Sequence, residues 1–133
     1  MISRLVWFVA AGSAIGGAAR LLLGTLIQQK IGPGFPMGTL IINITGSFLL
    51  AFILRYATVV PWVTPEWRAL LTTGFCGGYT TFSTFSFETA ALMEDGRYQR
   101  AALYMVLSVG VSLLGTFGGF AAARELLALR ETA

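Results

Sequence analysis

The sequence contains few of the residues that build reactive sites in soluble proteins. Among its 133 residues there is no histidine and a single cysteine, and only 11% are charged. This excludes a histidine-based catalytic site, a Cys/His zinc site and a disulfide framework, so we predict that the protein is not an enzyme. The nine Lys and Arg residues outnumber the six Asp and Glu residues but occur singly, whereas nucleic-acid-binding proteins cluster basic residues on one face. We therefore expect no nucleic-acid partner.

Apolar side chains, in contrast, are abundant and make up 56% of the chain. A helix needs about 20 mainly apolar residues to cross the hydrocarbon core of a bilayer, so the chain has room for four such helices with short turns. We predict an all-α membrane protein in the lipid bilayer, with one four-helix transmembrane domain over residues 1–133. The spans are expected at about 5–27, 37–57, 66–93 and 98–123. The first is longer than the apolar part of a cleaved signal peptide, because it continues past Arg20.

The middle of the third span is a poor helix. Residues 77–87 read GGYTTFSTFSF, in which glycine, β-branched, aromatic and hydroxyl-bearing residues replace the usual Leu and Ala. We predict a break near residues 77–81, whose freed carbonyls could coordinate a hard cation such as sodium and whose N–H groups could face an anion. The alternative is a close helix crossing, since Gly74 and Gly78 have the Gly-x-x-x-Gly spacing. The hydroxyl- and phenylalanine-rich run favours the break.

The fourth span carries a stripe of hydroxyl groups. Positions four apart lie on one helix face, and rotating hydroxyls can donate hydrogen bonds to a dehydrated anion without adding fixed charge. Alternatively, small residues such as Ser112, Gly115 and Gly119 permit close helix contact, and the hydroxyls bond the carbonyl four residues back. The stripe consists of Tyr104, Ser108, Ser112 and Thr116.

Five further residues stand out because they are polar or aromatic inside predicted spans. An unpaired amide is costly in lipid, so Asn43 either donates to an anion or bonds a neighbouring helix. Phe82 and Phe85 share one face beyond the predicted break, and their positive ring edges can contact an anion, although such pairs usually serve packing. Arg20 and Glu88 are ionisable, and each either lines a water-filled vestibule or forms a structural ion pair.

Basic residues are distributed almost evenly between the two predicted sides of the membrane. Four spans place both termini and the central loop on one side, with five arginines, and the two short turns on the other, with four Lys or Arg if Arg20 is counted. Because the Lys/Arg bias of short loops sets orientation, such a near tie would allow insertion both ways and pairing with an inverted copy. A few strongly placed arginines could equally well fix one topology.

Three stretches of the sequence together resemble a known family. Residues 16–20 read GGAAR, residues 38–48 read GTLIINITGSF, and residues 74–85 read GFCGGYTTFSTF. They are similar to the Fluc (CrcB) fluoride channel family over almost the whole chain. The resemblance implies a fluoride-selective channel that exports cytoplasmic fluoride passively across the bacterial inner membrane and protects against fluoride toxicity. It also implies an antiparallel, dual-topology homodimer with two pores.

The resemblance assigns roles to individual residues as well. It implies that main-chain carbonyls of Gly77 and Thr80 from both subunits surround a central, structural sodium ion. Arg20 and Glu88 would line the aqueous vestibules. Phe82 and Phe85 would form a box of phenylalanine rings with Asn43 beside the fluoride path. The implied fluoride pore comprises Asn43, Phe82, Phe85, Tyr104, Ser108, Ser112 and Thr116.

Two other classes of membrane protein are compatible with this size. A small four-span, proton-coupled exporter of cationic drugs needs a carboxylate within the membrane, and Glu88, near the end of a span, is the candidate. An assembly or insertion factor would use its small-residue faces to pack against other proteins, but it has no use for the hydroxyl stripe. Both alternatives rank below the channel.

Overall fold

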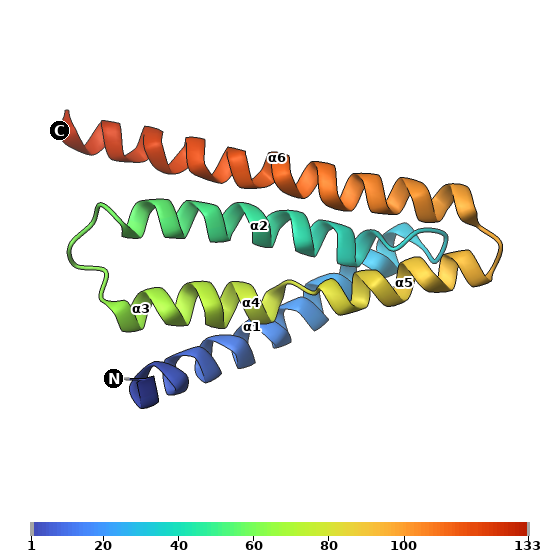
Figure 1. The fold of residues 1–133 in the computed structure, drawn as a ribbon, viewed down its shortest axis with the longest axis horizontal. Coiled ribbons are helices and arrows are strands. Elements are labelled where there is room, and N and C mark those ends of the chain that lie inside the picture. Colours follow the sequence, from blue (N-terminus) through green and yellow to red (C-terminus); the bar gives the residue numbers. More distant parts are fainter. Residues whose placement is uncertain (1, 133) are drawn as a thin grey trace.

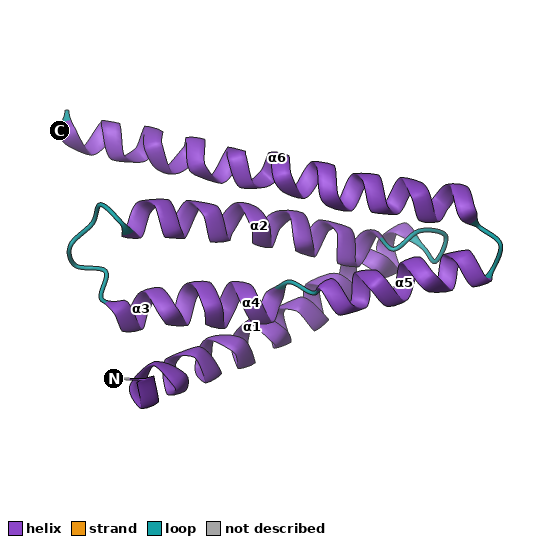
Figure 2. Cartoon of the chain, in the orientation of Figure 1, coloured by secondary structure: helices purple, strands orange, loops and turns teal. Residues whose placement is uncertain are grey.

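The computed structural model describes residues 2–132, and all regular structure in this part of the chain is helical (Figure 2). Three long helices, α1 (Ile2–Ile31), α2 (Met37–Ala57) and α6 (Tyr98–Glu131), are apolar enough to cross a membrane. A fourth, interrupted helix lies between α2 and α6 in the sequence (Figure 1). The predicted all-α architecture of four helices with an irregular third one is thus confirmed, while the membrane limits of each span stay a prediction.

The connections follow from residues that cannot continue a helix. Gly32 and Gly96 adopt φ angles of 96° and 73°, a left-handed conformation that glycine reaches without steric cost, and both lie in the turns after α1 and before α6. The two turns lie at one end of the molecule. The start of α1, the α2–α3 loop and the end of α6 lie at the other (Figure 1), as an even number of crossings requires.

The interrupted helix consists of four consecutive segments. These are α3 (Pro65–Ala69), the π-helical η1 (Leu70–Cys76), α4 (Gly77–Tyr79) and α5 (Phe82–Glu94). Thr80 (φ −84°, ψ 159°) and Thr81 (φ −153°, ψ 113°) are extended and separate α4 from α5. The break therefore occupies the C-terminal end of the predicted region, and Gly77 is itself helical. The sequence did not predict the π-helix; such segments are rare and often occur at functional sites.

Glycines let α1 cross the interrupted helix closely. A Cβ atom added to Gly12 or Gly16 would collide with backbone atoms of the interrupted helix, and one added to Gly74 or Gly78 would collide with backbone atoms of α1. The close Gly-x-x-x-Gly crossing considered as an alternative to the break is therefore present as well. The two features coexist because the crossing lies before the two extended threonines.

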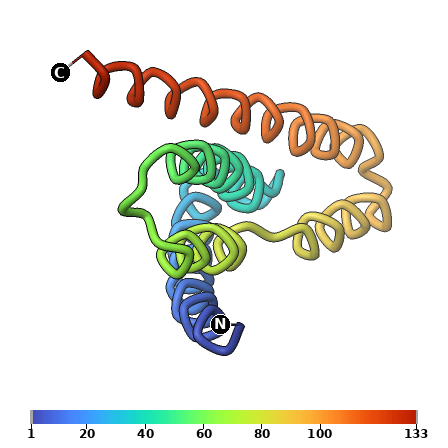
Figure 3. The backbone as a smooth tube through the Cα atoms, turned by 60° about the vertical axis from the view of Figure 1, so that its left-hand side comes forward, coloured from blue at the N-terminus to red at the C-terminus, as the bar shows by residue number. Residues whose placement is uncertain are grey.

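A second close contact joins α2 and α6. The backbone of Gly119 lies so near Phe48 that an added Cβ would collide with the Phe48 carbonyl, and Gly115 similarly faces Ile44. The small residues of α6 thus serve close packing, as the alternative for the fourth span proposed. Figure 3 shows α1 and α6 on opposite sides of the molecule, with α2 and the interrupted helix between them.

Candidate functional site

The break in the third helix borders a cavity of about 260 Å³. Residues of α2, α5 and α6 complete its lining together with both extended threonines. None of the lining residues in the described chain carries a charge. Six of the predicted site residues line this cavity: Asn43, Thr80, Phe82, Phe85, Ser108 and Ser112.

Asn43 makes two hydrogen bonds to the backbone of the break. Its Nδ2 donates to the Thr81 carbonyl at 3.0 Å, and the Thr81 N–H donates to its Oδ1 at 2.8 Å. Of the two possibilities for this amide, bonding to a neighbouring helix is therefore realised. Since the amide carries two N–H donors and only one is committed to Thr81, the other is available toward the cavity that Asn43 lines.

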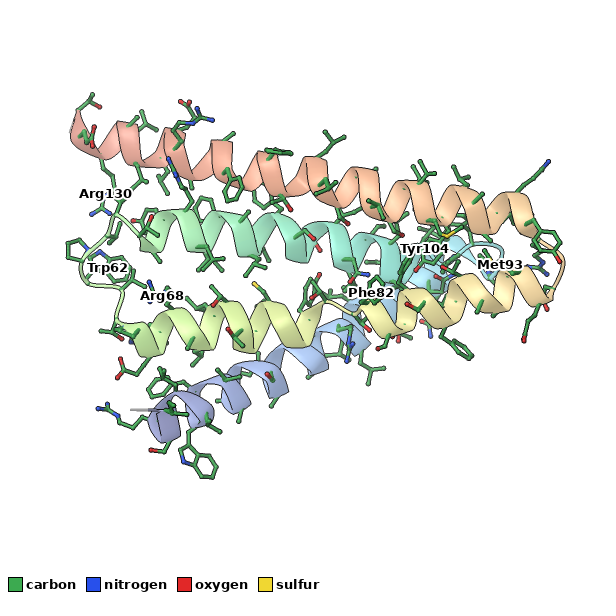
Figure 4. All side chains as sticks on the ribbon, in the orientation of Figure 1. Trp62, Arg68, Phe82, Met93, Tyr104 and Arg130 are labelled. Carbon is green, nitrogen blue, oxygen red and sulfur yellow. The ribbon has the colours of Figure 1, made fainter. Side chains whose placement is uncertain are left out.

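The two phenylalanines of the predicted box contact each other. The ring centroids of Phe82 and Phe85 lie 5.5 Å apart with the planes tilted by 49°, and the Phe85 ring lies 5.2 Å from that of Tyr104. Phe82 is 79% exposed in the single chain. Figure 4 shows Phe82 at the start of α5, beside the break. Both rings line the cavity, so they are placed to contact whatever enters it.

The hydroxyl stripe of α6 divides into three parts. The Ser108 and Ser112 hydroxyl oxygens are buried and have no hydrogen-bond partner among the described residues. Thr116 donates to the Ser112 carbonyl at 3.0 Å, so its hydroxyl is used within the helix, and it does not line the cavity. Tyr104, at the other end of the stripe, donates to Glu88. Buried hydroxyls without partners are rare, so Ser108 and Ser112 are distinctive in keeping uncommitted hydroxyls beside the cavity.

Glu88 is held by two hydroxyl groups. Tyr104 donates to Oε2 at 2.6 Å, and Thr39 donates to Oε1 at 2.9 Å. Figure 4 shows Tyr104 on α6 where that helix faces α5. Thr39 is not among the predicted site residues. Its position four residues before Asn43 places it on the same helix face, but nothing in the sequence pairs it with Glu88.

A second, larger cavity of about 680 Å³ brings Arg20 and Glu88 together. Both side chains are half-buried and line it with Gln28 and Thr39. Thr81 lines this cavity and the smaller one alike, so the two cavities lie on either side of one residue of the break. The two residues predicted for the vestibule thus line one cavity and five of the residues predicted for the pore line the other, whereas Tyr104 and Thr116 line neither.

Residues 2–132 contain no group of three or more His, Cys, Asp or Glu side chains that could hold a metal ion. Main-chain oxygens at the break are the remaining candidates. Helix α4 ends at Tyr79, and the last carbonyls of a helix have no partner within it. Gly77 lines neither cavity. Any part that it plays in binding an ion therefore falls to its main-chain carbonyl.

Comparison with known proteins identifies the family. A family model described as "CrcB-like protein, Camphor Resistance (CrcB)" matches residues 7–120. The Fluoride-specific ion channel FluC of Rhizobium meliloti (strain 1021) is 43% identical over 122 residues, which cover 92% of this chain and 98% of the relative. The FluC proteins of Geobacter sulfurreducens and Chlorobaculum tepidum are each 44% identical, over 89% and 90% of this chain and 95% and 94% of the relatives. The chain therefore belongs to the CrcB (FluC) family.

Proposed function

We propose that this protein is a fluoride-specific ion channel, the activity for which its FluC relatives are named. The observation that supports this best is the cavity at the break, into which α6 contributes two buried hydroxyls without partners, Ser108 and Ser112. An ion that accepts hydrogen bonds would satisfy both. The second Nδ2 hydrogen of Asn43 is a further donor on the same path.

The chemistry of this cavity suits a small anion that is strongly hydrated in water. Hydroxyl and amide donors can replace the hydration shell of fluoride, which is compact and accepts hydrogen bonds readily. Since none of the lining residues in the described chain carries a charge, binding stays weak enough for the ion to leave, as conduction requires. A larger anion such as chloride could not approach the same donors as closely.

The route to this pore leads through the larger cavity. Thr81 lines both spaces, and Arg20 supplies a positive charge that would draw anions in from water. In this proposal the larger cavity is the aqueous vestibule, and Glu88 helps to shape it by fixing Thr39 and Tyr104. The protein would export cytoplasmic fluoride passively across the bacterial inner membrane and so protect the cell from its toxicity.

The working channel in this proposal is an antiparallel homodimer with two pores. Phe82, which lines the cavity, is 79% exposed in the single chain, and Phe87 on the same helix is 74% exposed. A second copy would cover such aromatic surface beside the break. The nearly even distribution of Lys and Arg is consistent with insertion in both orientations.

A structural sodium ion at the centre of the dimer completes the proposal. Gly77 and Thr80 lie on the two sides of the α4 terminus, where carbonyls lack partners within a helix. Carbonyl oxygens suit a hard cation, so the residues present fit sodium. The ion would supply positive charge between the two subunits and tie their carbonyls together.

Ion efflux from liposomes tests the function directly. Purified protein is reconstituted, and the loss of fluoride and of chloride is recorded under the same gradient. We expect fast fluoride loss and negligible chloride loss. If correctly folded protein released no fluoride, the channel would be refuted, and proton-coupled export through Glu88 would be tested next by following cation uptake against a proton gradient.

A further inference from the structure

Two N–H groups at the break are diverted from the carbonyls that they would meet in a continuous helix. An α-helix pairs each N–H with the carbonyl four residues earlier, which would join Thr81 to Gly77 and Thr84 to Thr80. Instead, the Thr81 N–H donates to Oδ1 of Asn43 at 2.8 Å, and the Thr84 N–H donates to Oγ1 of Thr81 at 3.1 Å. Both acceptors are side-chain oxygens.

The carbonyls released in this way are those of Gly77 and Thr80. We propose that Asn43 and Thr81 are positioning residues that keep these two carbonyls free to bind the cation, by occupying the N–H groups that would otherwise pair with them. This inference rests on the sodium site of the proposed function. It assigns to Asn43 a task separate from contact with the permeating anion.

The contact between Asn43 and the break is well suited to this task. The amide bonds both the N–H and the carbonyl of Thr81, so it fixes the orientation of the peptide groups on either side of that residue. Thr81 is itself buried, with 7% of its surface exposed. A buried N–H must be satisfied, and without the amide the nearest helical acceptor would be the Gly77 carbonyl.

Helix α2 is held firmly against the break, so Asn43 acts from a rigid support. A Cβ added to Gly46 would collide with the Thr80 side chain and press on the Tyr79 ring. The backbone that carries the amide is therefore fixed close to the break.

Thr81 acts through its side chain, which caps the start of α5. Oγ1 of Thr81 accepts the Thr84 N–H and also lies 2.9 Å from the Thr84 hydroxyl, which is the arrangement of a helix N-cap. This cap begins α5 at Phe82 and at the same time leaves the Thr80 carbonyl without its helical donor. The Thr81 side chain thus caps the start of α5 and leaves the Thr80 carbonyl available to bind the cation.

The test compares the rate at which purified dimer releases bound radioactive sodium. The variants Asn43→Leu and Thr81→Val remove the two diverted acceptors, whereas Thr81→Ser retains its hydroxyl. Thr45→Val is the matched control, because it removes a hydroxyl from α2 that bonds a side chain of the interrupted helix and not its backbone. Fluoride flux at several sodium concentrations is recorded in parallel, and size-exclusion chromatography verifies the dimer.

We expect Asn43→Leu and Thr81→Val to release sodium about tenfold faster than the wild type, the factor that corresponds to about 1.4 kcal/mol. Raising the sodium concentration should restore flux in Thr81→Val. The Thr81→Ser and Thr45→Val dimers should release sodium as slowly as the wild type. Should Asn43→Leu fail to fold, the comparison of Thr81→Val with Thr81→Ser still tests whether the Thr81 hydroxyl keeps the carbonyls free.

Each opposite result has a distinct meaning. Wild-type sodium release from folded Asn43→Leu and Thr81→Val dimers would overturn the positioning role, even if their fluoride flux were low, because Asn43 would then serve the pore alone. A wild-type dimer that binds no sodium would overturn the sodium site and this inference with it. A wild-type dimer that retains sodium but passes no fluoride would overturn the channel function and leave the positioning role intact.

Discussion

Tyr104 donates its hydroxyl hydrogen to Oε2 of Glu88 across an O···O distance of 2.6 Å. Tyr104 has no exposed surface, and its ring packs edge-on against Phe35 and at a tilt against Phe85. The bond therefore joins α6 to α5 in the interior of the bundle, between the larger cavity that Glu88 lines and the phenylalanine pair. A half-buried carboxylate depends on such donors, because leaving it unsatisfied is costly.

Replacing Tyr104 with phenylalanine should slow fluoride flux and lower the free energy of unfolding by about 1–3 kcal/mol, the range for leaving a buried polar group unsatisfied. The ring packing is retained, so the effect reports the lost hydrogen bond. Thermal unfolding in detergent and liposome efflux measure the two quantities. Tyr98→Phe, at an exposed position, is the control. Equal stability and flux in both variants would show that the bond to Glu88 does not matter.

Phe82→Ile and Phe85→Ile should each slow fluoride flux strongly while the dimer stays intact. The aromatic edges that line the cavity are lost, whereas a large apolar side chain remains for packing. Efflux and size-exclusion chromatography make the comparison. Phe117→Ile is the control, since this exposed ring lies on α6 and lines neither cavity. Wild-type flux in both test variants would refute the pore role of the rings.

The double variant Ser108→Ala, Ser112→Ala should separate function from stability. Both hydroxyl oxygens are buried without a partner, so removing them costs no protein hydrogen bond and should leave the unfolding temperature unchanged or raise it. Fluoride flux should nevertheless fall, because the anion loses two donors. A drop in stability with unchanged flux would instead indicate that the serines pack the helices and do not contact the ion.

Gly16→Ala should destabilise the crossing of α1 over the interrupted helix. The added Cβ would collide with the carbonyl of Phe75, and overpacking of this kind costs about 1–3 kcal/mol. Gly17→Ala is a closely matched control, because no atom lies within 4 Å of the added Cβ. The unfolding temperatures of the two variants are compared. If they were equal, the close crossing would not contribute to stability.

Thr80→Ala should retain sodium. The proposed ligand is the main-chain carbonyl, which the substitution preserves, and the lost hydroxyl only donates to the Cys76 carbonyl at 2.9 Å. Replacing sodium by a large organic cation in every solution should, in contrast, weaken the dimer or its flux. Sodium binding is measured by retention of the radioactive ion. Indifference to sodium replacement in the wild type would argue against the cation site.

Much of the fold could be read from short stretches of sequence. Residues 32–36 read GPGFP and separate α1 from α2, because glycine and proline interrupt a helix through their own backbone geometry. The poor helix formers after Gly77 indicated an interruption for the same reason. The π-helix η1 and the exact site of the break could not be predicted, since both depend on how closely α1 and α2 approach the third helix.

The residues that line the cavity at the break could be predicted in part from the sequence, but their hydrogen bonds could not. Periodicity placed Ser108, Ser112 and Thr116 on one stripe, yet only the structure distinguishes the two unpartnered serines from the threonine that bonds within its own helix. Thr39 was missed, because a single threonine near a helix start carries no signal until Glu88 lies beside it. Hydrogen-bond partners come from other helices, so no local pattern encodes them.

The sequence by itself determined that the chain is an α-helical membrane protein, and its motifs indicated the family. These properties depend on the amino-acid composition and on short stretches of sequence, and neither requires the chain to be folded. Only the tertiary structure decided that Asn43 bonds the backbone of Thr81 and that Thr81 lines both cavities. Asn43 and Thr81 are 38 residues apart in the sequence, and the packing of α2 against the break brings them within hydrogen-bond distance.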